Sequence, residues 1–180
     1  MSTTNPVMHA LTLNQIPTHL GWTFTHLLSG TFKRNRSEFM HLDYPILAPL
    51  PHDGRHQQPL NGAAVPGPFI YFVHDDRGQV YYVGKSQEEH ILKRWIRPGN
   101  GGPAGHYWTH STRTGGCTFK IAEGLRSGHG PFHLCFASLL SLRDQFSNSL
   151  NVDWSADEKV TLRHTEVAMI CALNPLWNRP

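Results

Sequence analysis

The sequence lacks several features that would place it in a specialised class of protein. It has no run of about eighteen apolar residues, the length that a transmembrane helix needs. Its N-terminus lacks the basic start and apolar block of a secretory signal, and its three cysteines have no paired spacing. These absences predict a cytoplasmic protein without a membrane partner or a disulfide scaffold.

The composition is that of a globular protein with a modest excess of positive charge. Hydrophobic residues make up 39% and charged residues 16% of the 180 residues, and 16 Lys and Arg stand against 13 Asp and Glu. Between residues 85 and 126, seven basic residues stand against three glutamates. Such a local basic field attracts polyanions, most often nucleic acid, although a solvated basic surface explains it equally well.

The chain changes character near residue 66. Residues 16–30 predict a short helix, and the following residues contain a basic patch and a long Pro/Gly-rich segment without a sustained period. We therefore expect residues 1–66 to form an N-terminal arm or extension that contacts DNA or a partner. Residues 67–180 are expected to form the main domain.

The next segment predicts a β-hairpin. The runs FIYFV and VYYVG are rich in aromatic and β-branched residues, and the turn-forming residues DDRG lie between them. With the turn centred between Asp76 and Arg77, Tyr71 is expected opposite Tyr82 on one face of the hairpin. Side chains alternate along a strand, so Tyr81 is expected on the other face.

Four more elements are expected after the hairpin. Ser86 and Glu89 form a capping box that opens a helix, which Pro98 and Gly99 end. Residues 117–125 predict a third strand, residues 131–146 a helix, and residues 155–174 a final helix. Ser155 and Glu158 supply a second capping box for that final helix.

The ordered motifs on these elements resemble the GIY-YIG nuclease family over residues 68–180. Residues 69–71 match the first motif, although phenylalanine stands where the family has glycine, and residues 82–84 match the second. The matching single residues, in chain order, are Tyr71, Tyr82, Arg94, Glu166 and Asn178. The resemblance implies an α+β fold with a small three-stranded antiparallel sheet flanked by helices. The N-terminal arm and an insertion at about residues 98–155 would be additions to it.

This resemblance implies a metal-dependent DNA endonuclease. Phosphodiester hydrolysis needs an activated water and relief of charge on the phosphoryl oxygens. The general base would be Tyr71, with Lys85 stabilising its phenolate and Tyr82 positioning the water or the phosphate. A phosphoryl oxygen would be held by Arg94, and one Mg²⁺ or Mn²⁺ by Glu166. An enzyme of the restriction or defence kind is expected, because no recognition module follows the nuclease motifs.

Other residues are expected to assist or to contact double-stranded DNA. The possible helpers are His106, His110 and Asn178, and the last is expected to tie the C-terminal segment to the hairpin. The expected DNA contacts are Lys33, Arg34, Arg36, Lys93, Arg97 and Arg113. The segment 99–126 is expected to read the DNA sequence. One active site cuts one strand, so a double-strand break predicts a homodimer or two successive visits.

Three alternatives remain open from the sequence. One is a catalytically silent nucleic-acid-binding module of the same fold, and another is a structure-specific DNA repair nuclease. The third is a small zinc-dependent interaction protein with ligands drawn from Cys117, His129, His133 and Cys135. Paired ligand spacing, which is typical of zinc sites, is missing from this last set.

Overall fold

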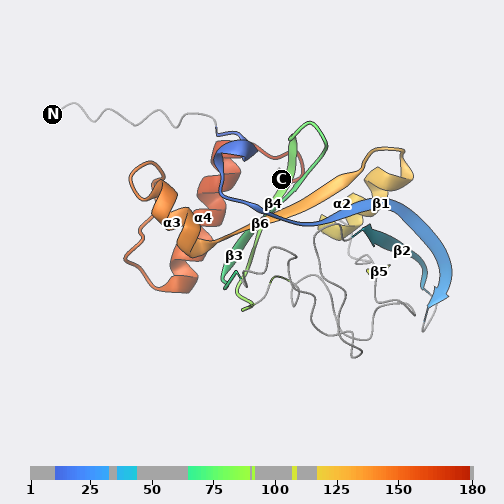
Figure 1. The fold of residues 1–180 in the computed structure, drawn as a ribbon, viewed down its shortest axis with the longest axis horizontal. Helices are drawn as coiled ribbons and strands as arrows, with labels where there is room; N and C mark the ends of the chain where they lie inside the picture. Colours follow the sequence, from blue (N-terminus) through green and yellow to red (C-terminus); the bar gives the residue numbers. More distant parts are fainter. Residues whose placement is uncertain are drawn as a thin grey trace.

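The computed structural model describes residues 11–32, 36–43, 65–89, 91, 107–108 and 117–178. These ranges contain one antiparallel sheet, three α-helices and a 3-10 helix (Figure 1). In chain order the elements are η1 (Leu13–Gln15), β1 (His19–Phe32), β2 (Arg36–Asp43), β3 (Phe69–His74), β4 (Val80–Ser86), β5 (Tyr107–Trp108), α2 (Cys117–Arg126), β6 (Phe132–Ser138), α3 (Leu139–Phe146) and α4 (Glu158–Leu173). The protein is therefore α+β, as the sequence predicts.

The sheet is larger than the three strands expected. Its order is β4-β3-β6-β1-β2-β5, with five strands of six residues or more and a two-residue strand β5 at one edge. Strands β1 and β2 come from the segment expected to be an arm, and β1 pairs with the interior strand β6. Strand β6, in turn, comes from the segment expected to be an insertion. Both segments thus supply strands to the sheet that holds the hairpin.

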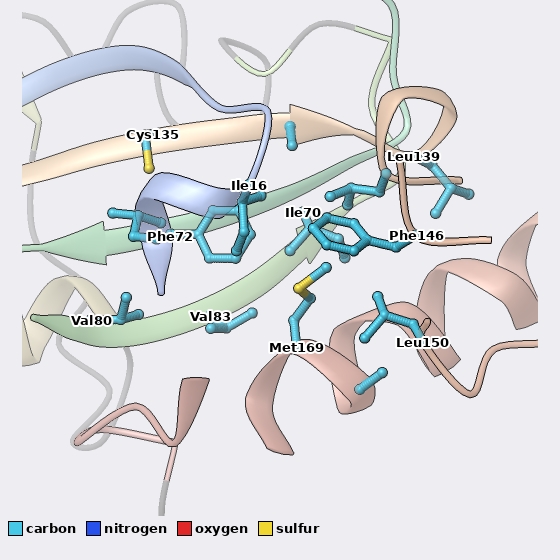
Figure 2. Packing of buried hydrophobic residues seen from close by; sticks show 14 of the residues in the cluster. Ile16, Ile70, Phe72, Val80, Val83, Cys135, Leu139, Phe146, Leu150 and Met169 are labelled. Atoms are coloured by element: carbon cyan, nitrogen blue, oxygen red, sulfur yellow. The ribbon is translucent and has the colours of Figure 1, made fainter. Parts of the chain in front are cut away.

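One face of the sheet packs against η1, α3 and α4. Ile70, Phe72 and Val83 point from β3 and β4 toward this face, where Met169 of α4 lies against them (Figure 2). All four side chains are completely buried. This layer fixes α4 beneath the hairpin, because the apolar area removed from water stabilises the packed arrangement.

The opposite face packs against α2. Phe69, Tyr71 and Val73 alternate with the residues of the first face along β3, and they contact Phe136 of β6 in a second buried cluster. Ile121 of α2 is fully buried in the same cluster. Strand β3 is therefore buried on both faces, which explains its unbroken apolar sequence.

Residues 16–30, expected as a helix, form most of strand β1. Leu20 and Phe24 have a spacing that fits a helix, but this segment is also rich in Thr, Trp and Phe, which favour strands. Strand β1 pairs with β6 over residues 19–24 and with β2 over residues 23–32, so every part of it has a neighbouring strand on at least one side. The helix prediction is wrong because tertiary pairing outweighs a weak local preference.

The predictions for residues 117–146 exchange strand and helix. Residues 117–126 form helix α2, not a strand, with Ile121 and Leu125 one turn apart on the face that meets the sheet. Residues 132–138 form strand β6, and only residues 139–146 form a helix, α3. Ser138 separates the two elements because its side chain accepts a hydrogen bond from the Ser141 amide at 3.1 Å.

The final helix lies where the sequence predicts it, with a different N-cap. Helix α4 begins at Glu158, and Asp157 caps it by accepting a hydrogen bond from the Lys159 amide at 2.9 Å. The predicted cap, Ser155, instead donates its hydroxyl to Asp153 at 2.6 Å. The helix ends at Asn174, whose left-handed φ of 48° is typical of a C-terminal cap. Within the described ranges, no helix combines the length and apolar character needed to cross a membrane.

Candidate functional site

The predicted hairpin forms, but its register differs by two residues. Tyr71 pairs with Gly84, not with Tyr82. One extra residue enters at the turn, where Gly78 adopts a φ of 77° that an L side chain rarely tolerates. The other enters at a bulge between the pairs Val73–Tyr82 and His74–Val80, so that Tyr81 has no partner of its own.

Tyr71 and Tyr82 share a face, as predicted, because two added residues restore the alternation. Their rings stack diagonally across the two strands, with centroids 6.1 Å apart and planes inclined at 27°. Only 3% of Tyr71 is exposed, whereas Tyr82 is half-buried. The two phenol rings are therefore one packed unit that spans the hairpin.

Gly84 provides the space that the Tyr71 ring occupies. A Cβ atom added to Gly84 would lie 2.5 Å from both Cζ and Oη of Tyr71, well inside van der Waals contact. Tyr71 starts on β3, and neighbouring strands lie about 4.8 Å apart, so the hydroxyl end of its ring lies over β4, the outermost strand on this side of the sheet. The glycine of the second motif thus has a direct steric reason.

Tyr81 packs against the same cluster as Tyr71 and Tyr82, and its predicted place on the opposite face is wrong. Its ring lies 5.3 Å from that of Phe132 and 4.9 Å from that of Trp177, measured between centroids. The cause is the bulge, which puts two successive side chains on one side of the strand.

Lys85 and Glu166 form an ion pair on the other face of the hairpin. The Lys85 ammonium donates to Oε2 of Glu166 in α4, and the side chains are 37% and 18% exposed, respectively. Lys85 alternates with Gly84 along β4, so it leaves the strand on the side that α4 covers. The structure thus pairs Lys85 with the glutamate expected to bind metal.

The C-terminal segment covers the outer edge of β4. Oδ1 of Asn178 accepts a hydrogen bond from the Val83 amide at 2.7 Å, and its Nδ2 donates to the Val83 carbonyl at 2.8 Å. The Trp177 amide donates to the Tyr81 carbonyl at 2.6 Å. The predicted tie between Asn178 and the hairpin is confirmed. These bonds satisfy backbone groups that an edge strand would otherwise expose.

A further contact holds this segment from the other side. Lys120 of α2 donates its ammonium to the Trp177 carbonyl at 2.6 Å. The sequence gives no signal for this bond, because a lysine and a carbonyl 57 residues apart share no local pattern. Helix α2, which packs on the core, forms the last part of segment 99–126, the segment expected to read DNA.

The hairpin tip is fixed by a polar cluster that sequence reasoning missed. His133 of β6 bonds through Nε2 to Asp76 in the turn at 2.6 Å and through Nδ1 to the Thr23 hydroxyl at 2.9 Å. The His74 ring lies 5.1 Å from that of His133, between centroids. Burial lowers the pKa of His74 below its usual 6.5, although its bond to the Asp75 carbonyl opposes this shift.

Several predicted site residues lie outside the described residues. They are Lys33, Arg34, Lys93, Arg94, Arg97, His106, His110 and Arg113. The backbone of Arg36 begins β2. At the start of the predicted helix, Ser86 accepts a hydrogen bond from the Glu88 amide at 3.2 Å, and Ile91 is helical and buried beside Tyr71. Ser86 is the last residue of β4 and residues 87–89 are not helical, so the predicted helix N-cap at Ser86 is wrong: its hydroxyl stabilises the turn that follows the strand.

The Glu166 carboxylate is the side chain that the resemblance implies for a metal. Hard cations such as Mg²⁺ prefer oxygen and keep several waters, so one carboxylate and a substrate phosphate suffice to hold them. In the ranges that the structure describes, no three His, Cys, Asp or Glu side chains are grouped to hold a metal ion. The residues therefore fit a site in which Glu166 would be the protein ligand, and waters and a substrate phosphate would be the other ligands.

The residues of the zinc alternative have other roles where they are described. Burial raises the pKa of the Cys135 thiol to about 12, despite a hydrogen bond with Thr18. A protonated thiol is a poor metal ligand. Both ring nitrogens of His133 are hydrogen-bonded, to Asp76 and Thr23. These two side chains do not favour a zinc site.

Comparisons with protein-family models, with curated proteins and with solved structures find no match to this chain.

Proposed function

We propose that this protein is a metal-dependent endonuclease that hydrolyses phosphodiester bonds in double-stranded DNA and belongs to the restriction or defence kind. The observation that supports it is the arrangement around β4. The stacked Tyr71 and Tyr82 meet this strand on one face at Gly84, and the ion pair of Lys85 with Glu166 lies on its other face. Of the five single residues that carry the resemblance, the four that the structure describes, Tyr71, Tyr82, Glu166 and Asn178, all contact β3 or β4, and this supports the proposal.

Because β4 is the outermost strand on one side of the sheet, side chains from both of its faces can contact one phosphate at its edge. The Tyr71 hydroxyl extends over Gly84, and the next residue along the strand, Lys85, carries its ammonium to the opposite face. A phosphate at the edge beyond Val83 would therefore lie between the two groups. Strand β4 is the outermost strand on this side of the sheet, and the described C-terminal segment bonds only as far along it as Val83.

Each side chain has a defined task in the proposed reaction. Tyr71 takes a proton from the attacking water, and Tyr82 orients that water or the phosphate. Free tyrosine titrates near pH ~10, so a phenolate needs a neighbouring cation, and Arg94 is the proposed source. The predicted role of Lys85 beside the phenolate is not retained, because Lys85 leaves β4 on the opposite face and pairs with Glu166. Arg94 holds a phosphoryl oxygen as negative charge develops on it. When bound, the metal ion at Glu166 neutralises charge on the phosphate.

A silent nucleic-acid-binding module of the same fold is the second candidate. One observation favours it: Tyr71 is only 3% exposed, as a purely structural core tyrosine would be. A module of this kind would bind DNA through its basic residues and would leave the strands intact. The two candidates differ in one measurable product, a cut strand.

The test is cleavage of a supercoiled plasmid with Mg²⁺ or Mn²⁺, with and without a chelator. Glu166→Gln should abolish cleavage and leave DNA affinity equal or higher, because it removes a ligand and a negative charge near the phosphate. Glu158→Gln is the matched control, since it makes the same change on an exposed residue at the start of the same helix. DNA binding without cleavage by the wild-type protein would favour the silent module. Cleavage by Glu166→Gln at the wild-type rate would remove the metal role of Glu166.

A further inference from the structure

The contact between Lys85 and Glu166 defines the state of the site before substrate arrives. Among the described residues, neither Lys85 nor Glu166 has a second polar side-chain partner. Glu166 is the more buried of the two, at 18% exposure, whereas Lys85 at 37% keeps a path to solvent. Arg163, an alternative partner three residues earlier in α4, is exposed and makes no ion pair with Glu166.

This arrangement places two cations in competition for one carboxylate. A half-buried carboxylate is costly without a counter-charge, and Lys85 supplies it. A divalent cation on the same carboxylate would repel the ammonium at a distance of a few ångströms. The metal and Lys85 are therefore alternative counterions of Glu166.

We propose that Lys85 is an exchangeable counterion, which a divalent cation displaces from Glu166 and which a DNA phosphate then captures. This inference rests on the proposed function, because it takes Glu166 as the metal ligand. Displacement moves the ammonium from a neutral pair to the substrate, at the point where a phosphodiester needs positive charge. The long, flexible lysine stem allows this movement without a change in the fold.

The exchange makes metal binding and DNA binding cooperate. A phosphate that captures Lys85 removes the competitor from Glu166, so DNA raises metal affinity, and by linkage metal raises DNA affinity equally. A permanent structural salt bridge would behave differently. In that case Glu166 would keep Lys85, and the ammonium would stay in place when Mg²⁺ is added.

The test measures Mn²⁺ binding to the full chain without DNA, with water-proton relaxation as the readout. Lys85→Met removes the competing charge, and we expect it to tighten Mn²⁺ binding by about fivefold, which corresponds to about 1 kcal/mol for a partly exposed pair. Lys85→Arg restores the charge and should return the affinity toward that of the wild type. Lys159→Met is the matched control, since this exposed lysine of α4 is not the partner of Glu166.

A second measurement needs no substitution. In the wild-type protein, the ¹⁵N resonance of the Lys85 ammonium should shift or broaden when Mg²⁺ is added, because the ammonium leaves its partner. An unchanged resonance at saturating Mg²⁺ would overturn the exchange.

The outcomes separate this inference from the proposed function. Equal Mn²⁺ affinity in the wild type and Lys85→Met, combined with weaker binding in Glu166→Gln, overturns the exchange and leaves the metal role of Glu166 intact. Mn²⁺ binding that does not depend on Glu166 in any variant overturns the exchange as well. The plasmid assay with Glu166→Gln then decides the proposed function by itself.

Discussion

Gly84→Ala is the substitution for which the geometry of the site gives the most specific prediction. The added methyl would lie 2.5 Å from Cζ and Oη of Tyr71, and ordinary carbon contacts need about 3.5 Å, so the ring must move by roughly 1 Å. Overpacking of this kind costs about 1–3 kcal/mol, or about 2–12 °C in Tm for a chain of this size. A displacement of about 1 Å at a reacting group can reduce a rate by about 10²-fold.

The assay is urea unfolding in a double-mutant cycle with Tyr71→Ala, together with plasmid cleavage by Gly84→Ala alone, because Tyr71→Ala removes the proposed general base. Without the Tyr71 ring, Gly84→Ala should be neutral or stabilising by up to about 1 kcal/mol, because alanine restricts the unfolded chain more than glycine does. In the wild-type background the same change should destabilise the protein and suppress cleavage. If Gly84→Ala costs nothing in either background, the ring does not occupy the space above Gly84 and the geometry of the site is wrong.

Three further predictions follow from single contacts. Asn178→Ala should lower the free energy of unfolding by about 1–2 kcal/mol in urea titrations, because two hydrogen bonds to Val83 are lost at a partly exposed edge; an unchanged midpoint would contradict the tie. In the native protein at about pH 8, Ellman's reagent should modify the exposed Cys171 and spare Cys135, whose pKa burial raises to about 12; rapid modification of Cys135 would contradict its burial. Burial lowers the pKa of His74 below 6.5, so the unfolded chain binds more protons below that pH, and stability should fall as pH drops from about 6.5; His74→Gln should weaken this fall, and an identical pH profile would exclude it.

The hairpin and the last helix were predictable because their signals are local. The aromatic runs on either side of the turn specify two strands, and Asn174 before a proline specifies a helix end. The shared face of Tyr71 and Tyr82 was predicted correctly from a register that is wrong by two residues, because a shift of two preserves strand alternation. The register itself was not predictable, since a left-handed Gly78 and a bulge at Tyr81 each add a residue that local propensity leaves undetermined.

The remaining errors come from segments whose structure tertiary contacts decide. The apolar run at residues 132–138 has no clear period, because its side chains are buried on both faces of the sheet, and such a run reads as helix or strand. Residues 117–126 form a helix because Ile121 and Leu125 meet the sheet together. The pairing of Lys85 with Glu166 joins residues 81 positions apart, beyond the reach of any local pattern.

The most direct test of the account is the rate of plasmid cleavage by Tyr71→Phe under single-turnover conditions with Mg²⁺ or Mn²⁺. The substitution keeps the stacked ring and removes the hydroxyl, so the fold should persist while the rate falls by about 10²-fold or more. Tyr81→Phe, which removes a hydroxyl from the ring packed on Phe132 and Trp177, is the matched control and should cleave at nearly the wild-type rate. Cleavage by Tyr71→Phe at the wild-type rate, or no cleavage by the wild-type protein with either metal, would contradict the central claim.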